Sequence, residues 1–354
     1  MARMTALDLT SDIVDLTAAL VDIESVSGDE QAITDAIEEA LTPVPWLELW
    51  RRHHSLVART SLGRDERVVI AGHVDTVPLN HNLPARKDQE LLHGLGACDM
   101  KGGVAVALLL ASAPEPNRDV TYVFYEAEEV EADRNGLRLI SAVRPELLVA
   151  DFAILMEPSN AQVEAGCQGT MRVDVTTTGL RAHSARSWNG VNAIHGAAEI
   201  LERLARYEPR LPVIDGLTFH EGLNAVYVSG GVAGNVIPDT CTVSINHRFA
   251  PDRDEAQAEA HMREVFDGFA VRVMDSAPGA LPGLDRPAAA AFLQAVGGTA
   301  NPKFGWTDVA HFSALGVPAV NFGPGNPELA HTKAENVPLA QLHSCLEVMT
   351  SWLS

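Results

Sequence analysis

The chain has 354 residues, of which 46% are hydrophobic and 21% are charged, so it can bury one or two ordinary cores and does not have the composition of a disordered protein. Its length exceeds that of a typical single domain, which favours two domains. The formal net charge of -21 would repel nucleic acid and anionic membrane surfaces, so neither is an expected partner.

The N-terminus, the apolar runs and the cysteines together predict the compartment. Residues 1–12 contain no long apolar stretch behind a basic region, so no signal peptide is expected. The longest apolar run, residues 104–113, is about half the length that spans a bilayer, so no membrane span is expected. Four cysteines are scattered without a CxxC pair, which is typical of reduced thiols. A cytoplasmic protein is therefore predicted.

The first half of the chain alternates between helical and strand-like patterns. Apolar positions recur at helical spacing in residues 11–23 and 28–41, and short strands follow within residues 46–60. The chain then continues through strand 67–71, helix 102–113, strand 120–125, helix 136–143 and strand 152–156. Strands that alternate with helices predict parallel βαβ units, in a sheet covered by helices on both faces.

From about residue 169 the pattern changes. The expected elements are strand 170–178, helix 191–207, strands 224–232 and 240–249, helix 254–269 and strand 270–274. This βαββαβ order predicts a small sheet with two helices on one face. A Pro/Gly-rich linker at residues 278–287 leads back to the first pattern, with helix 287–296, strand 319–322 and helix 338–353. The predicted fold is an α/β domain with a smaller α+β domain inserted into it.

A histidine and an aspartate follow the first strand of the predicted parallel sheet. Residues 68–71 form an apolar strand that runs directly into Gly72-His73-Val74-Asp75. Side chains two positions apart in an extended chain share a side, so His73 and Asp75 can face the same way. A metal-bound histidine usually donates its other ring N–H to a carboxylate, and Asp75 is well placed to accept it. Taken alone, the pair favours a structural or solvent-exposed histidine.

Asp99 lies in a glycine-dense loop, residues 94–103, directly before an apolar helix. Its position suits a helix N-cap. The density of glycines instead indicates tight turns or a close approach of the backbone to a ligand. The loop contains neither GxGxxG nor GxxxxGK[ST], so it is not a phosphate-binding loop. From these residues alone, helix cap and metal ligand both stay open for Asp99.

Acidic residues follow two further strands of the predicted sheet. Strand 120–125 ends in Glu126-Ala127-Glu128-Glu129-Val130-Glu131, and strand 153–156 ends in Glu157-Pro158. A run of acids is usually a solvated loop, but α/β proteins place their ligand crevice at the carboxyl ends of parallel strands. The position of the acids therefore favours a shared site.

One more histidine completes a possible metal site. It is His331, in the loop 330–336 between a Gly/Pro-rich segment and the final helix, where a lone histidine is more often exposed to solvent. Two histidines and three carboxylates suit two zinc ions, or less selectively cobalt or manganese, with one carboxylate as a bridge and a position left for water. The candidate ligands are His73, Asp99, Glu129, Glu157 and His331.

The segments that carry these residues resemble the M20 metallopeptidase family. They are GHVDTVP (72–78), GLGACDMKGG (94–103), EAEEV (126–130), MEPS (156–159) and AHTKAENV (330–337). The family includes succinyl-diaminopimelate desuccinylase, acetylornithine deacetylase, aminoacylases and dimeric carboxypeptidases. The resemblance covers nearly the whole chain. It implies an α/β catalytic domain with two zinc ions, residues 1–171 and 283–354, and an inserted ferredoxin-like dimerisation domain, residues 172–282.

The resemblance assigns the five candidate ligands to two ions. It implies that His73, Asp99 and Glu157 hold one zinc ion. It implies that Asp99 also bridges to the second ion, together with Glu129 and His331.

The resemblance also implies roles for three residues that are not metal ligands. Glu128 matches the general base of the family, and Asp75 matches the acid that orients the first histidine ligand. In the inserted domain, residues 179–185 resemble the GxxAHS segment of the family. Its histidine, His183, would reach into the active site of the partner subunit and polarise the scissile carbonyl.

The substrate-binding residues are also expected from resemblance. Segments 234–239 and 246–249 are similar to substrate-binding positions of the inserted domain, with Asn235 in the first and Arg248, which can clamp a carboxylate, in the second. Segment 305–312, with Thr307, looks most like the actinobacterial type of succinyl-diaminopimelate desuccinylase, as do segments 322–327 and 167–170.

One departure from the family concerns the acyl group. Proteobacterial desuccinylases carry an arginine pair where Cys167-Gln168 stands here, so a carboxylate contact expected there is missing. Either another residue, such as Arg181 or Arg186, recognises the succinyl end of the substrate, or the acyl group differs.

The expected protein is a zinc-dependent homodimeric hydrolase of a small N-acyl amino acid. The favoured reaction converts N-succinyl-LL-2,6-diaminopimelate and water to succinate and LL-2,6-diaminopimelate, in the biosynthesis of lysine and peptidoglycan precursors. Two alternatives are another M20 N-acyl-amino-acid deacylase, such as an acetylornithine deacetylase or an aminoacylase, and a non-catalytic metal-binding relative.

Overall fold

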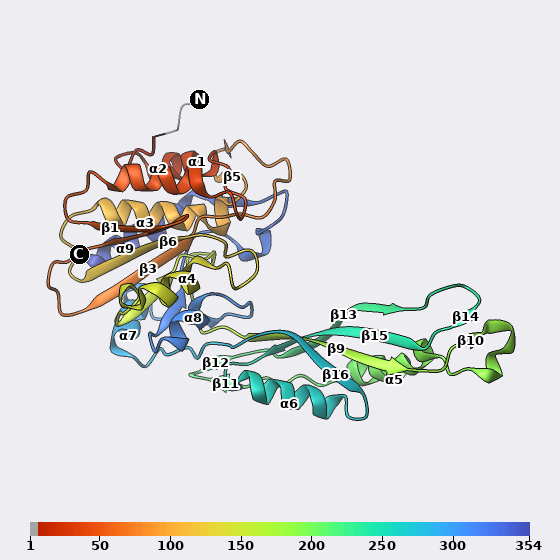
Figure 1. Cartoon of the computed structure of the whole chain (residues 1–354). Coiled ribbons are helices and arrows are strands. Elements are labelled where there is room, and N and C mark those ends of the chain that lie inside the picture. Colours follow the sequence, from red (N-terminus) through yellow and green to blue (C-terminus); the bar gives the residue numbers. More distant parts are fainter. Residues whose placement is uncertain (1–5) are drawn as a thin grey trace. The chain divides into compact units, whose positions relative to one another are not determined.

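The computed structural model describes residues 6–354 (Figure 1). The segment 1–12, in which no signal peptide is predicted, therefore lies partly outside the described residues. The chain divides into two compact units. The first comprises the chain up to Ala165 together with Pro282–Asn301 and His311–Ser354, and the second comprises Gly166–Leu281 and Pro302–Ala310.

An eight-stranded sheet, in the order β1-β2-β6-β3-β7-β18-β8-β17, forms the centre of the first unit. Its strands are β1 (Glu48–Arg52), β2 (Ser55–Arg59), β3 (Arg67–His73), β6 (Asp119–Tyr125), β7 (Phe152–Leu155), β8 (Val163–Ala165), β17 (Ala300–Pro302) and β18 (Ala319–Asn321). The central strands β6, β3, β7 and β18 run parallel, as predicted. β1, β2 and β8 pair antiparallel with their neighbours, so the sheet is mixed.

The parallel strands are mostly apolar because both faces of the sheet are covered. Every residue of β6 and of β7 is buried. The helix that follows the glycine-dense loop, α3 (Gly102–Ser112), is apolar on all sides and is buried in the same way. It packs against β3 and β6 and is covered in turn by α1 (Ile13–Val21), α2 (Gln31–Leu41) and α9 (Leu339–Leu353) (Figure 1).

A close approach between backbones joins α3 to the end of β7. A Cβ atom added to Gly103 would lie 2.2 Å from the carbonyl oxygen of Met156, so only glycine fits at this position. The contact fixes the start of α3 beside the chain that leaves β7 at Glu157. The glycine-dense loop and the acid after β7 are thereby brought to the same edge of the sheet.

A small sheet that was not expected from the sequence closes this edge. It has three strands in the order β19-β5-β4, namely β19 (Asn336–Pro338), β5 (Leu91–His93) and β4 (Arg86–Lys87). β19 pairs antiparallel with β5. The pairing places the loop before β19, with His331, beside the glycine-dense loop after β5. The other helices of this part of the chain are α4 (Gly136–Val143), α7 (Pro287–Ala295) and α8 (Val309–Ala314).

The second unit is built on a four-stranded antiparallel sheet in the order β13-β15-β9-β16. In chain order its main elements are β9 (Gly169–Thr178), α5 (Ala193–Ala205), β13 (Gly222–Gly230), β15 (Thr240–Phe249), α6 (Glu255–Val265) and β16 (Ala270–Ala277). The predicted βαββαβ order is confirmed. Buried residues alternate along β9 and β15, and α5 and α6 pack against the sheet. The predicted fold class, an α/β domain with a smaller α+β domain inserted, is confirmed.

The ends of the helices differ from the prediction by a few residues, for local reasons. α6 begins after Asp254, whose side chain accepts a hydrogen bond from the N–H of Gln257 in a capping box. α5 begins after Asn192, which accepts hydrogen bonds from two backbone N–H groups of the first turn. Capping residues stand outside the helix that they begin, so α5 and α6 start one or two residues later than predicted.

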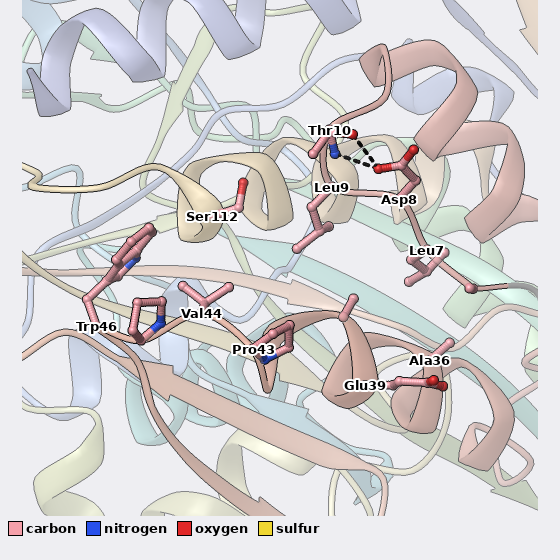
Figure 2. Close-up of a pocket in the computed structure, with 13 residues that line it drawn as sticks. Leu7, Asp8, Leu9, Thr10, Ala36, Glu39, Pro43, Val44, Trp46 and Ser112 are labelled. Atoms are coloured by element: carbon pink, nitrogen blue, oxygen red, sulfur yellow. Dashed lines mark hydrogen bonds between the residues drawn. The ribbon is translucent and has the colours of Figure 1, made fainter.

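No helix within residues 6–354 is both long and apolar enough to cross a membrane. A cavity of about 560 Å³ lies between residues 6–10, the end of α2 and residues 43–46 (Figure 2). Its lining includes Leu7, Val44 and Trp46, and the carboxylate of Asp8 there accepts two hydrogen bonds from Thr10. None of the predicted site residues lines this cavity, so it is not the candidate site.

Candidate metal centre

The predicted ligands of the first unit converge at the carboxyl edge of its parallel strands. His73 is the last residue of β3, Glu129 lies in the loop after β6, and Glu157 lies two residues beyond β7. Strands that run parallel bring their carboxyl ends to one edge, and this is where α/β proteins bind ligands. Asp99 comes from the loop before α3, and His331 comes from the loop before β19.

Two groups of three side chains form at this edge and share Asp99. The ligand atoms of His73, Asp99 and Glu157 all lie within 4.8 Å of one another, and so do those of Asp99, Glu129 and His331. Asp99 Oδ1 is 3.1 Å from His73 Nε2, whereas its Oδ2 is 3.3 Å from His331 Nε2. His331 Nε2 is also 2.7 Å from Glu129 Oε1. One carboxylate thus presents one oxygen to each group, as a bridge between two ions requires.

The interpretation of Asp99 as a helix cap is wrong. The residue before α3 is Lys101, and no side chain caps this helix. Asp99 itself has non-helical dihedral angles, φ -118° and ψ 90°, and its carboxylate faces the two histidines. The backbone N–H groups of Cys98 and Asp99 are instead held by Glu335, whose Oε1 lies 3.2 Å from each nitrogen.

The pKa values of Asp99, His73 and His331 are all shifted toward the charged forms of these side chains. Burial opposes the charge of Asp99, but hydrogen bonds with His331 and His73 hold the pKa of Asp99 well below its ordinary value. Burial likewise lowers the pKa of His73, yet hydrogen bonds with Asp75 and Asp99 outweigh it, so this pKa lies well above its ordinary value. Hydrogen bonds with Asp99 and Glu129 raise the pKa of His331 to about 10. The carboxylates that raise the pKa of these histidines carry negative charge that would also attract metal cations.

Asp75 is fully buried and connects β3 to the loop after β6. Its Oδ1 is 3.4 Å from His73 Nδ1 and accepts a hydrogen bond of 3.1 Å from the N–H of Glu128. Its Oδ2 accepts hydrogen bonds from the hydroxyl of Ser27 at 2.7 Å and from the N–H of Glu129 at 3.2 Å. Asp75 therefore lies beside Nδ1 of His73, which is also 3.1 Å from the backbone carbonyl of Asp75, and its carboxylate fixes the backbone of the acidic loop.

Two buried residues of the site were not singled out from the sequence. Glu335 is buried, and burial raises its pKa. Lys101 is also buried, its Nζ donates a hydrogen bond of 2.7 Å to the carbonyl of Ile23, and burial lowers its pKa to about 7. Both lie in segments that resemble the family, but their partners are distant in sequence, so no local pattern indicates what they contact.

The predicted substrate-binding residues lie in the second unit, in two separate places. His183 ends β10 (Ala182–His183), and the N–H of the next residue, Ser184, donates a hydrogen bond of 2.9 Å to the carbonyl of Asn235. Arg248 lies on β15 opposite Thr170 of β9. Thr307 is buried, and its carbonyl is 3.8 Å from Cys167 Sγ, close to the start of β9. His183 and Asn235 therefore form one pair, while Arg248 and Thr307 lie at the opposite end of β9.

Gln168 lies where an arginine was expected from resemblance, and Arg181 and Arg186 are the residues considered in its place. Gln168 is buried, and its Nε2 donates a hydrogen bond of 2.7 Å to the carbonyl of His220. Arg181 is exposed and forms an ion pair of 2.8 Å with Asp239. Arg186 is exposed in a short helix, Ser184–Asn189, which follows His183 directly.

Comparisons with known proteins identify the family. The model described as Peptidase family M20/M25/M40 matches residues 69–354, and the chain belongs to this family. It is 52% identical to a Mycobacterium tuberculosis protein provisionally named as the succinyl-diaminopimelate desuccinylase DapE, over 98% of this chain and 99% of that protein. It is 46% identical to the succinyl-diaminopimelate desuccinylase of Corynebacterium glutamicum, over 98% of each.

A solved structure shares the fold at low sequence identity. The YXEP protein of Bacillus subtilis, described as a dinuclear metal-binding peptidase from the M20 family, matches with a TM-score of 0.72. It is 19% identical to this chain, and the match covers 96% of both chains.

We expect the substitution Asp75→Asn to weaken the binding of divalent metal about 10- to 100-fold, which is the usual cost of losing the carboxylate behind a histidine ligand. The amide removes the negative charge behind His73 and turns an NH2 group toward the N–H donors of the acidic loop. Competition with a chelator for zinc measures the affinity.

The control is Asp88→Asn, because Asp88 also accepts hydrogen bonds from two backbone N–H groups and lies 2.9 Å from a histidine, His93, but does so at the surface. This control should bind zinc like the wild type. Circular dichroism verifies folding, and Ser27→Ala, which removes only one hydrogen bond to Asp75, should have a smaller effect. A zinc affinity of Asp75→Asn within twofold of wild type would contradict the assignment.

Proposed function

We propose that this chain is an amide hydrolase that holds two divalent metal ions, zinc by preference, and releases an acyl group from the nitrogen of an amino acid. The observation that carries the proposal is the position of Asp99, which presents one carboxylate oxygen to each of the two three-residue groups. In this proposal His73 and Glu157 complete the first ion's ligands, and Glu129 and His331 complete those of the second.

The donor set fits these ions chemically. Imidazole nitrogens and carboxylate oxygens are ligands of zinc, and three protein ligands for each ion leave a coordination position for water or substrate. When bound, two such ions supply Lewis-acid chemistry, because they polarise the scissile carbonyl and lower the pKa of an attacking water. The related YXEP protein, described as dinuclear, supports the same stoichiometry.

Glu128 is the general base in this proposal. Its backbone N–H is fixed by Asp75, and its carboxylate lies within 4.8 Å of the ligand atoms of His73 and Glu129. A carboxylate held beside the ligands can take a proton from the attacking water and then deliver it to the departing amine. Asp75 keeps the ring of His73 oriented with Nε2 toward Asp99.

The substitution Glu128→Ala should lower kcat about 100- to 10,000-fold while leaving two metal ions bound per chain, since general base catalysis contributes a factor of this size. Steady-state kinetics and metal analysis by mass spectrometry measure the two effects separately. Glu131→Ala is the matched control, because Glu131 is an exposed acid of the same loop. Turnover within tenfold of wild type would show that Glu128 is not the base.

The favoured substrate is N-succinyl-LL-2,6-diaminopimelate. Support comes from relatives named as desuccinylases, which match at 46–52% identity over 98% of this chain. We propose that Arg248, half-buried on β15, clamps a substrate carboxylate, assisted by Thr307. Arg181 is already paired with Asp239, so Arg186 is the better candidate for the succinyl carboxylate.

A panel of substrates tests this assignment. The zinc-loaded protein should show its highest kcat/KM on N-succinyl-LL-2,6-diaminopimelate, compared with N-acetylornithine and other N-acyl amino acids, when release of amine is measured. Its activity should also exceed that on a dipeptide with a free α-amine. A higher kcat/KM on an N-acetyl substrate would make the protein a deacetylase of the same family. No turnover of any member, with two zinc ions bound, would make it a non-catalytic relative.

We propose further that the protein acts as a homodimer, with residues 1–171 and 283–354 responsible for catalysis and residues 172–282 for the contact between subunits. β13 is an edge strand of the second unit, and the side chains of Val226, Tyr227 and Val228 on it are all exposed. An exposed apolar edge strand is a surface that proteins normally cover.

The two ends of β9 give a second reason for a dimer. A strand of ten residues spans roughly 30 Å, which is longer than a small N-acyl amino acid. One substrate molecule therefore cannot contact Arg248 at one end and His183 at the other within a single subunit. If both take part, the partner subunit supplies His183, with Asn235 beside it. In that position His183 would donate a hydrogen bond to the developing oxyanion.

Mixing two inactive variants tests the shared site. His183→Ala and Glu128→Ala should each be nearly inactive as homodimers. After subunit exchange at equal concentration, half of the dimers are mixed and each has one complete site, so activity should return to about a quarter of wild type. Subunit exchange is verified by native mass spectrometry. Exchange without recovery of activity would place His183 in the active site of its own subunit, or outside catalysis altogether.

A further inference from the structure

A second group of metal-ligating side chains lies beside the acidic loop, outside the centre described above. Glu30, His54 and Glu126 each offer one ligand atom, and these atoms all lie within 4.8 Å of one another. Glu30 directly precedes α2, His54 directly precedes β2, and Glu126 directly follows β6. None of the three belongs to either group that shares Asp99.

Glu30 carries a buried carboxylate with one oxygen unsatisfied. The residue is 0% exposed. Its Oε1 accepts hydrogen bonds from the N–H groups of Gly28 at 2.8 Å and Ala127 at 3.2 Å. Its Oε2 is buried and has no hydrogen-bond partner within residues 6–354. Because a buried carboxylate oxygen that accepts no hydrogen bond is costly, Oε2 is the atom that a bound cation would satisfy.

His54 and Glu126 provide the other two donors. Nδ1 of His54 is buried and, like Oε2 of Glu30, has no hydrogen-bond partner in the described part of the chain. Glu126 is also buried, and its carboxylate is held in place by hydrogen bonds from the Ser55 hydroxyl at 3.0 Å and the His54 N–H at 3.2 Å. An imidazole whose Nδ1 has no partner and two buried carboxylates thus lie close together.

The three side chains line a cavity that has room for an ion and its water ligands. Its volume is about 320 Å³, and a water molecule takes roughly 30 Å³ in the liquid. Asp133 and Arg134 also line this cavity. The guanidinium of Arg134 lies 3.6 Å from the carboxylate of Glu131, which is not a member of the group.

We propose that Glu30, His54 and Glu126 form a third divalent-cation site, which binds zinc through one imidazole, two carboxylates and water. Ligand atoms about 2 Å from a zinc ion lie roughly 3–4 Å apart, so small rotations of these side chains close the present spacing. The ion neutralises two buried carboxylates and satisfies the free oxygen of Glu30. Its effect is structural, because it ties the starts of α2 and β2 to the first residue of the loop that presents Glu128 and Glu129.

The experiment counts zinc in a background from which the main centre has been removed. The double variant His73→Ala/Asp99→Ala breaks every three-residue ligand group of the main centre, including that of His73, Glu128 and Glu129, but retains the third site. After equilibrium dialysis against buffered zinc, this background should hold one zinc ion per chain. Adding Glu30→Gln or His54→Asn should abolish that binding and also the rise in Tm that zinc produces in the background.

Two matched controls accompany these variants. Glu39→Gln changes an exposed carboxylate on α2, the helix that Glu30 precedes. His53→Asn changes the exposed histidine next to His54. Both should keep the bound zinc ion. Circular dichroism verifies that each variant is folded. If Glu30→Gln does not fold, His54→Asn provides the test, because His54 is only half-buried. A background that binds no zinc, or equal zinc in the site variants and the controls, would overturn the proposal.

Discussion

The buried carboxylate of Asp75 is the interaction on which the arrangement of the active edge depends. It lies beside His73 at the end of β3, and it also accepts hydrogen bonds from the backbone N–H groups of Glu128 and Glu129 after β6. A charged group without solvent needs partners, and these partners come from two neighbouring parallel strands. Asp75 therefore orients the ring of His73 through its backbone carbonyl, 3.1 Å from Nδ1, as well as its carboxylate. The carboxylate also sets the positions of the proposed base and of a proposed ligand of the other ion. The hydroxyl of Ser27 completes its hydrogen bonds.

A metal centre built from carboxylates must hold like charges together, and in this chain hydrogen bonds to the backbone N–H groups of Asp99, Glu128 and Glu129 hold three of these acids in place. Glu335 accepts hydrogen bonds from the backbone N–H groups of Cys98 and Asp99, which fixes the proposed bridging residue, Asp99, without adding a positive charge beside it. Glu30 accepts a hydrogen bond from the backbone N–H of Ala127, which lies in the same loop as Glu128 and Glu129. Like charges in a low-dielectric site repel strongly, so such a centre is stable only when cations complete it.

The sequence predicted the fold because its main elements are set by local patterns. β6 and α3 are apolar at nearly every position, and β9 alternates in burial, so each pattern identifies its element without knowledge of the partner. The site was predicted only as far as strand ends and family resemblance allow. Glu335 contacts a loop 237 residues away, and the pairing of β19 with β5 is equally remote, so neither leaves a local signal. Asp99 likewise meets His73 and His331, which are remote in sequence, so the local pattern could not decide between a helix cap and a metal ligand.

The second unit shows why family resemblance predicts the chemistry more sharply than the substrate. Metal ligands are constrained by the geometry of the ions, whereas a recognition residue can be replaced once another side chain provides the charge. Resemblance led us to expect an arginine near Gln168, but Gln168 is buried and donates a hydrogen bond to the backbone carbonyl of His220, close to the start of β9. In the proposed function, an arginine of the second unit provides this carboxylate contact instead. Arg181 is paired with Asp239, which leaves Arg186, close to His183, so in the proposed dimer acyl recognition and oxyanion stabilisation come from one short segment of the partner subunit.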